Sequence, residues 1–204
     1  MAQLREKKKR ETRQRISDVA TALFFARGFD EVTVDEIAIA ADVSKMTVFN
    51  YFARKEELML DREDDLKLLP FLQALRVRPN HQAPIDALRA LVQRMSDQRH
   101  PLCHVNKQMV GWWRIVTSSP ALRARLREIS DEAAEGLALE LAGPNADGLA
   151  RLAAGMIVLT VRTAHAEAIC MVERGMPAKK ANAAFLDVVN RGLSAVENLV
   201  AIGA

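Results

Sequence analysis

The sequence is poor in residues that interrupt helices and in residues that fill β-sheets. Its 204 residues include nine glycines, seven prolines and ten aromatic residues, against 32 alanines. Glycine and proline are the least favourable residues inside helices and alanine is the most favourable, whereas β-strands are enriched in aromatic residues. The composition therefore predicts an all-α protein of one or two domains and argues against a large β-sandwich or barrel.

Cysteine and long apolar runs are also scarce. Two cysteines far apart, Cys103 and Cys170, do not make a disulfide framework, which agrees with a reducing compartment. The longest uncharged stretch, Leu152 to Val161, is ten residues long, whereas a membrane-spanning helix needs about 20. The N-terminus is charged and lacks the apolar segment of a signal peptide. We therefore expect a cytoplasmic protein with no membrane partner.

Positive charge is concentrated at one end of the chain. Residues 1–16 contain seven basic and two acidic side chains, a net charge of +5, whereas the other 188 residues sum to −2. Such a basic arm is typical of a contact with a polyanion, and the same charges also suit the solvated first turns of a helix. Both interpretations stay open from the charges alone.

Apolar residues follow helical spacing along nearly the whole chain. Ile16, Val19, Ala20, Leu23 and Phe24 form one stripe, and Gly28 follows where a left-handed helix cap is expected. About nine helices are predicted, over residues 4–27, 34–41, 45–51, a long fourth helix from 55 that is kinked or interrupted at Pro70, then 85–98, 103–117, 120–141, 147–174 and 178–201.

Two domains are expected, with the boundary inside the long fourth helix, which would join them rigidly. Six of the ten aromatic residues lie between Phe24 and Phe52, enough bulk to give residues 1–60 a small core of their own. Residues 61–204 then form a larger helical domain.

Capping residues define two short helices within the first domain. Thr33 and Glu36 have the spacing of a capping box, and Ser44 is placed to cap the helix that follows the tight connection Asp42-Val43. Two short helices joined in this way make a helix-turn-helix when the second helix is free to enter a DNA groove. Its apolar positions, Val48 and Phe52, are expected to face inward, while the polar side chains of residues 45–51 face outward.

The stretch from Ala22 to Leu58, ALFFARGFDEVTVDEIAIAADVSKMTVFNYFARKEEL, resembles the N-terminal domain of the TetR family of transcriptional regulators. The resemblance covers about residues 11–58. It rests on the Gly28-Phe29 pair, the Thr-capped second helix, Val43-Ser44, Thr47, Phe49, Tyr51-Phe52 and the Lys55–Leu58 segment. Double-stranded operator DNA is the partner that this resemblance implies.

The resemblance also implies which residues contact DNA, partly through phosphates and partly through bases. They are Thr33, Ser44, Lys45, Met46, Thr47, Phe49, Asn50, Tyr51 and Lys55. Three positions depart from the family pattern. Met46 stands where glycine or proline is common, Phe49 replaces the commoner tyrosine, and Arg54 stands where a serine cap is usual, so the mode of binding is better defined than any base.

The last two predicted helices carry more apolar surface than one small subunit can hide. The helix over 147–174 is apolar nearly all round. The last helix repeats apolar residues at Phe185, Val188, Val189, Val196, Leu199 and Val200. The resemblance implies that these helices pair with their copies in a four-helix bundle, giving the two-fold dimer that a pseudo-palindromic operator requires.

A small apolar or amphipathic effector is expected in the second domain. Its pocket is predicted from the few bulky or flexible side chains there, Met109, Trp112, Trp113 and Met156, with Thr163 as a polar anchor. Thr163 belongs to a polar group with Arg162, His165 and Glu167 that interrupts the apolar helix. These four either form salt bridges across the dimer or face the pocket.

An all-α enzyme or a metal-binding protein is the alternative from a different class. His100, Cys103 and His104 lie within five residues, but no second Cys/His cluster is near them in sequence. No glycine-rich phosphate loop, G-x-S-x-G or H-E-x-x-H motif is present. We therefore expect a ligand-responsive transcriptional regulator, most simply a repressor, with no cofactor, no metal and no catalytic activity.

Overall fold

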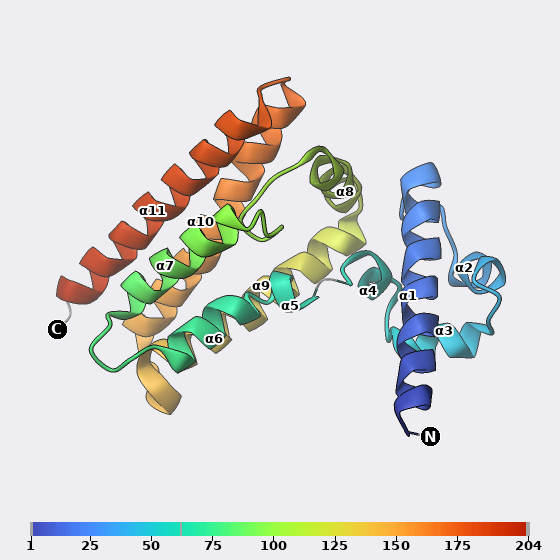
Figure 1. Cartoon of the computed structure of the whole chain (residues 1–204), viewed down its shortest axis with the longest axis horizontal. Coiled ribbons are helices and arrows are strands. Elements are labelled where there is room, and N and C mark those ends of the chain that lie inside the picture. The colour runs from blue at the N-terminus through green and yellow to red at the C-terminus, as the bar shows by residue number, and fades with distance from the viewer. Residues whose placement is uncertain (1, 62, 203–204) are drawn as a thin grey trace. The chain divides into compact units, whose positions relative to one another are not determined.

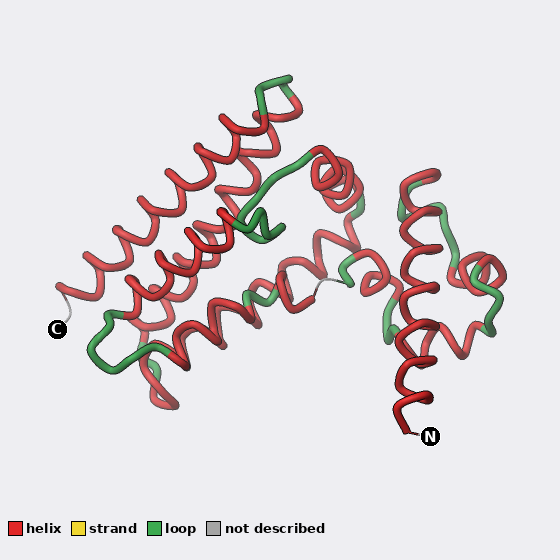
Figure 2. The backbone as a smooth tube through the Cα atoms, viewed as in Figure 1, coloured by secondary structure: helices red, strands yellow, loops and turns green. Residues whose placement is uncertain are grey.

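The computed structural model describes residues 2–61 and 63–202, and every regular element in those ranges is a helix (Figures 1 and 2). The all-α prediction is confirmed, with eleven α-helices in the described residues where about nine were expected. In chain order they are α1 (Ala2–Arg27), α2 (Val34–Ala40), α3 (Lys45–Tyr51), α4 (Lys55–Met59), α5 (Glu63–Leu66), α6 (Leu69–Val77), α7 (Pro84–Asp97), α8 (Lys107–Ser118), α9 (Pro120–Ala142), α10 (Gly148–Glu173) and α11 (Ala178–Ile202), with a short 3₁₀ turn at Gly143–Asn145.

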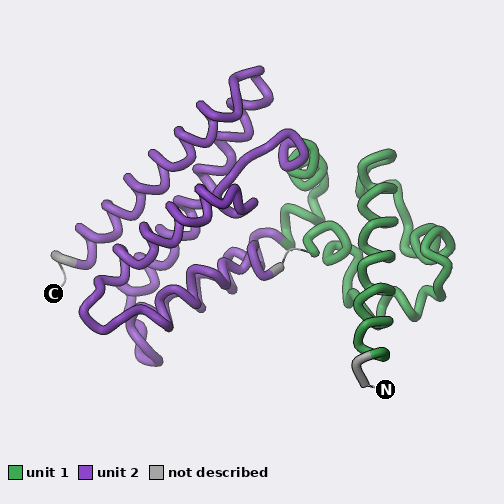
Figure 3. The backbone as a smooth tube through the Cα atoms, viewed as in Figure 1, with its two compact units in different colours: residues 1–63, 111–125 green, residues 64–110, 126–204 purple. Residues whose placement is uncertain are grey.

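The helices divide into two compact units (Figure 3). Unit 1 contains residues 1–63 together with 111–125, and unit 2 contains residues 64–110 and 126–204. Unit 1 therefore includes the end of α8 and the start of α9, which a division at residue 60 does not anticipate. The proposed functional roles of residues 1–60 and 61–204 stay predictions.

Unit 1 is built on the apolar stripe of α1. Ile16, Ala20 and Phe24 are fully buried, while Val19 and Leu23 are half-buried beside them. The stripe ends where predicted, because Gly28 has a φ of 90° and donates its N–H to the Phe24 carbonyl at 2.9 Å. Other buried residues of this core come from α2, α3, α4 and the second segment, namely Ile37, Ala38, Val48, Leu58, Val116 and Leu122.

The single long fourth helix is wrong, because the structure has three short helices in its place. Leu60 ends α4, and the next residue, Asp61, accepts a hydrogen bond from the Ser17 hydroxyl at 2.9 Å and pairs with Arg13, both on α1. Leu68 adopts a left-handed φ of 53° before α6, and Pro70 lies in the first turn of that helix. The rigid helical link expected between the domains is therefore absent from the described residues.

The helix predicted from Cys103 begins four residues later, at Lys107. The buried side chain of Asn182 accepts a hydrogen bond from the Val105 N–H at 2.7 Å and donates to the Val105 carbonyl at 3.0 Å. The Val105 N–H and carbonyl are therefore hydrogen-bonded to a side chain and not within a helix. Asn106 then caps α8 by accepting the Met109 N–H at 2.9 Å.

In unit 2, α10 and α11 lie side by side as a long pair (Figure 1). A Cβ atom added to Gly192 of α11 would lie 2.3 Å from the Thr160 Cγ2 and Oγ1 atoms of α10, so the two helices approach closely there. Phe185, Val189 and Val196 of α11 are buried in this contact region of the chain's own fold. By length and composition α10 could cross a membrane, a test that buried helices of soluble proteins also pass.

Candidate nucleic-acid interface

The capping box predicted at the start of α2 is present. The Thr33 hydroxyl accepts the Glu36 N–H at 3.2 Å, and the Glu36 carboxylate accepts the Thr33 N–H at 2.8 Å. Arg27 of α1 donates to the same carboxylate at 2.6 Å. The Thr33 backbone N–H first, and then the Arg27 guanidinium, lower the pKa of Glu36 from 4.5 to about 2.

The charge of Glu36 is expected to stabilise the fold, and this stabilisation is expected to be lost in strong acid. A lowered pKa means that its contribution is complete above about pH 4.5 and is lost as the pH falls towards about 2. Glutamine at this position keeps a capping side chain without the charge. Urea unfolding of wild type and Glu36→Gln across this range should therefore give a stability difference that favours wild type at pH 6 and disappears near pH 2. A difference that does not vary with pH would contradict the assignment.

The turn between the two short helices directs α3 outward. Asp42 adopts a left-handed φ of 52°, and Ser44 caps α3 by accepting the Thr47 N–H at 3.0 Å. The Ser44 and Thr47 hydroxyls also form a hydrogen bond with each other at 2.8 Å. Val48 and Phe52 point inward and are almost completely buried, as predicted.

The remaining positions of α3 form a surface that is free in this unit. Lys45, Met46, Phe49 and Asn50 are exposed, and Thr47 and Tyr51 are half-buried. One face of α3 is therefore exposed, and its side chains differ in length. A helix-turn-helix needs such a face to contact base edges in the major groove. As expected from Arg54, α4 begins without a side-chain cap from its N-cap residue.

Both lysines predicted to contact DNA have protein partners in the structure. Lys45 Nζ lies 2.8 Å from the Asp35 carboxylate, and both side chains are more than half exposed. Lys55 Nζ donates to the Phe29 carbonyl at 2.6 Å and lies 4.2 Å from the centre of the Phe29 ring. Burial lowers the pKa of Lys55. A phosphate contact by Lys55 therefore stays a prediction that requires this side chain to turn outward.

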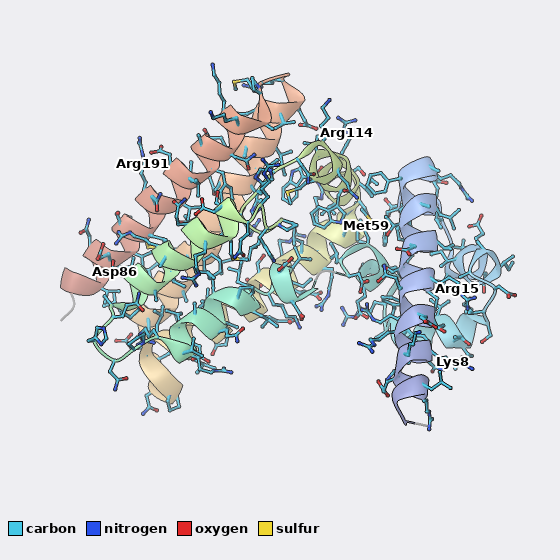
Figure 4. The ribbon with its side chains drawn as sticks, viewed as in Figure 1. Lys8, Arg15, Met59, Asp86, Arg114 and Arg191 are labelled. Atoms are coloured by element: carbon cyan, nitrogen blue, oxygen red, sulfur yellow. The ribbon has the colours of Figure 1, made fainter. Side chains whose placement is uncertain are left out.

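The basic arm continues α1 as a helix. Residues 5–10 are exposed on it, and the side chains of Lys8 and Arg15 project from it (Figure 4). Arg13 lies over the Phe52 ring, 4.6 Å from its centre, at the end of α3. The arm therefore carries its charge in the same unit as the helix-turn-helix.

The predicted residues of the effector pocket are not gathered in one unit. Trp112 and Trp113 belong to unit 1, whereas Met109, Met156 and Thr163 belong to unit 2. Trp112 uses its indole N–H on the Met59 carbonyl at 2.9 Å, and Thr163 is exposed. The pocket stays a prediction.

The contacts that attach segment 111–125 to the first three helices were not predicted from sequence. The Ser119 hydroxyl donates to the Asp30 carboxylate at 2.7 Å, and Gly111 lies so close to Phe25 that a Cβ atom there would be 3.0 Å from its ring. These pairs are 86 or more positions apart in sequence. No local sequence pattern predicts these contacts.

The alternative based on Cys103 and His104 gains no support from the surroundings of these residues. Cys103 is buried, and burial together with Asp65 raises the pKa of its thiol to about 12, so it is not a reactive thiolate at neutral pH. Within residues 2–61 and 63–202 no group of three or more His, Cys, Asp or Glu side chains is placed to hold a metal ion.

In unit 1, α2 packs against both α1 and the exposed, Ser-capped helix α3. This arrangement is a helix-turn-helix of the DNA-binding type. Comparison with known proteins agrees. Residues 16–61 match the family model for bacterial regulatory proteins of the tetR family. Residues 16–61 therefore form a DNA-binding domain of the TetR family type, as the sequence suggested.

Two sequence relatives and one solved structure extend the comparison. TcmR, an HTH-type transcriptional regulator of Streptomyces glaucescens, is 35% identical over 134 residues, which cover 63% of this chain and 58% of TcmR. MftR of Mycobacterium tuberculosis is 49% identical over 47 residues, 23% of this chain and 24% of MftR. Both alignments thus span less than two thirds of the relative. SmeT, solved as a triclosan complex, shares the fold with 21% identity, 91% coverage of both chains and a TM-score of 0.60.

Proposed function

We propose that this protein is a cytoplasmic, ligand-responsive transcriptional repressor that binds a pseudo-palindromic operator as a homodimer. The observation that carries the proposal is the exposed face of α3, in the same unit as a basic arm and within a domain of the TetR family. TcmR, which shares 35% identity over 134 residues, is itself a transcriptional regulator. In this role unit 1 contacts operator DNA, and a small molecule bound in the second domain releases it.

The second copy would bind through α10 and α11. Along α10, Leu152 and Leu159 are 53% and 59% exposed in the single chain and are seven residues apart, which places them on one face. Only a third of the most apolar window of α10 is buried within the chain. Exposed apolar surface of this kind marks an interaction site, and the two-fold symmetry of a dimer matches the two halves of a palindrome.

The effector is proposed to be a small apolar or amphipathic molecule. Support comes from the apolar, methionine-containing second domain and from SmeT, which has the same fold and was solved with triclosan. SmeT is described as the repressor of a multidrug efflux pump of Stenotrophomonas maltophilia. Arg162, Thr163 and Glu167 are exposed on α10, so salt bridges across the dimer and contacts with the effector both remain compatible with their positions.

A salt titration tests the DNA contact of the arm. Each phosphate that a lysine or arginine neutralises contributes about −0.9 to the slope of log K against log salt concentration. The triple variant Lys8→Gln, Lys9→Gln, Arg10→Gln should bind all sequences more weakly, with a slope shallower by up to about 3 for each subunit, or about 5 for the dimer. The matched control, Lys179→Gln with Lys180→Gln, removes exposed charge from the start of α11 and should leave the slope unchanged. Equal slopes for the triple variant and wild type would show that the arm is only solvated.

A ligand screen tests the effector. Both tryptophans of the chain, Trp112 and Trp113, belong to one segment, so a compound bound beside them should change the tryptophan fluorescence. The same compound should weaken operator binding by the factor by which the operator weakens compound binding, because the two effects are thermodynamically linked. If the compounds that change the fluorescence all leave operator binding in the gel-shift titration unaltered, they bind without regulating the protein. That result would count against the proposed role.

A further inference from the structure

The outward face of α3 is dominated by apolar and uncharged side chains. Val48 points into the core, and on the opposite side Met46 and Asn50 are four residues apart, so they are neighbours on one face. Met46 is 68% exposed, and Phe49, next to it at a spacing of three, is 39% exposed. Two large apolar side chains are therefore presented together on a helix of only seven residues.

Groups suited to guanine are missing from this face. The most frequent specific contact to guanine is a bidentate one from arginine or lysine to the O6 and N7 atoms. Helix α3 contains no arginine, and its one lysine, Lys45, lies at the helix start with its Nζ 2.8 Å from the Asp35 carboxylate. A cation neutralised by a neighbouring carboxylate is poorly placed to select a guanine edge.

The polar groups that remain favour adenine. The Thr47 hydroxyl is hydrogen-bonded to Ser44, and both Thr47 and Tyr51 are half-buried. The exposed Asn50 amide is therefore the clearest donor and acceptor on the face. An asparagine amide matches the N6 and N7 atoms of adenine, and apolar side chains match the 5-methyl group of thymine. The flexible side chain of methionine can adapt to a methyl group at more than one position.

We propose that α3 recognises an operator half-site of A·T pairs, in which Asn50 hydrogen-bonds to adenine while Met46 and Phe49 contact thymine methyl groups. This inference rests on the proposed function and adds the class of sequence that the same site selects. The specificity for base sequence then comes from the side chains at positions 46, 49 and 50, and Lys45 contributes none of it.

Selection from a random pool of double-stranded DNA with the full-length protein is the first test. A·T pairs should be enriched at the positions that each α3 contacts, in two inverted copies. Enrichment of G·C pairs at those positions would overturn the inference while leaving the proposed function intact. Failure to enrich any sequence would instead overturn the proposed function, so the two failures are distinguishable.

Replacing thymine by deoxyuridine in the selected site tests the contact itself. The substitution removes only the 5-methyl group, which lies in the major groove, so phosphate contacts by the arm are unaffected. Wild-type affinity should fall about fourfold for each contacted methyl, the value of one buried methyl-sized group. With Met46→Ala, the difference between thymine and uracil at its position should disappear. Equal wild-type affinities for the two duplexes would overturn the assignment.

Two variants complete the test. Ile39 of α2 is 79% exposed but lies outside the recognition helix, so Ile39→Ala should keep the full discrimination between thymine and uracil. Asn50→Ala should lose about 5- to 100-fold of the preference for adenine over other bases at one position. All three substituted side chains are exposed, and an unchanged unfolding curve will confirm that each variant is folded. Retention of the adenine preference by Asn50→Ala would contradict its assigned role.

Discussion

Replacing Leu159 with glutamate is expected to convert a dimeric protein into a folded monomer. Leu159 is exposed in the single chain, so the substitution leaves the core of each copy unchanged. In the proposed dimer the same position lies within an apolar interface, and the two-fold axis brings in a second unpaired carboxylate. An uncompensated buried charge costs about 3 kcal/mol or more, which is roughly a hundredfold in the dissociation constant.

Light scattering at micromolar concentration will measure this change, with circular dichroism to show that helix content is retained. Two matched substitutions separate the interface from the fold. Val77→Glu adds the same charge at an exposed apolar position of α6 and should remain dimeric, whereas Val189→Glu adds it to a fully buried position of α11 and should unfold the chain. A Leu159→Glu protein that stays dimeric would show that another surface joins the copies.

The second large effect is expected at Gly192, where Gly192→Ala should destabilise the fold. An alanine in a helix is normally more favourable than glycine by up to about 1 kcal/mol. Here its Cβ atom would lie 2.3 Å from two atoms of Thr160, so α10 and α11 must move apart. Such overpacking typically costs about 1–3 kcal/mol of unfolding free energy.

Chemical denaturation of Thr160→Gly, of the double variant with Gly192→Ala and of Gly148→Ala will test the cause. Thr160→Gly removes the three atoms nearest to the new Cβ atom of Gly192→Ala, so the double variant should show a favourable coupling between the two sites. Gly148→Ala is the control, because nothing lies within 4 Å of an added Cβ atom there and little change is expected. If the changes in unfolding free energy at positions 160 and 192 are additive, the contact with Thr160 is not the reason for the cost of Gly192→Ala.

Local signals made much of this fold predictable. The capping box at Thr33, the serine cap of α3 and the glycine cap of α1 depend on residues within four positions of each other, and all three are confirmed. The outward face of α3 was also predictable, because Val48 and Phe52 identify its buried side.

Features that depend on distant residues were not predictable in the same way. The break after α4 coincides with the contacts of Asp61 with Arg13 and Ser17, and the late start of α8 reflects the hydrogen bonds of Asn182. Apolar periodicity also does not distinguish a face that is buried within the chain from one that contacts a second copy. Val189 and Val196 suggested an interface between copies, but they are buried within the chain. The exposed large apolar side chains of the two helices are Leu152 and Leu159 of α10 and Val200 of α11.

The affinity ratio between two DNA duplexes tests the central claim, that α3 gives this protein sequence-specific DNA binding. Fluorescence anisotropy at one fixed salt concentration will compare the duplex obtained by selection with a scrambled duplex of the same base composition. Equal composition and salt cancel the electrostatic part of the binding free energy, which is the same for any sequence. The predicted result is a ratio of at least about 10³ for wild type, as is typical of specific operators, and a much smaller ratio for Asn50→Ala. Equal affinities of the wild-type protein for the two duplexes would contradict the claim.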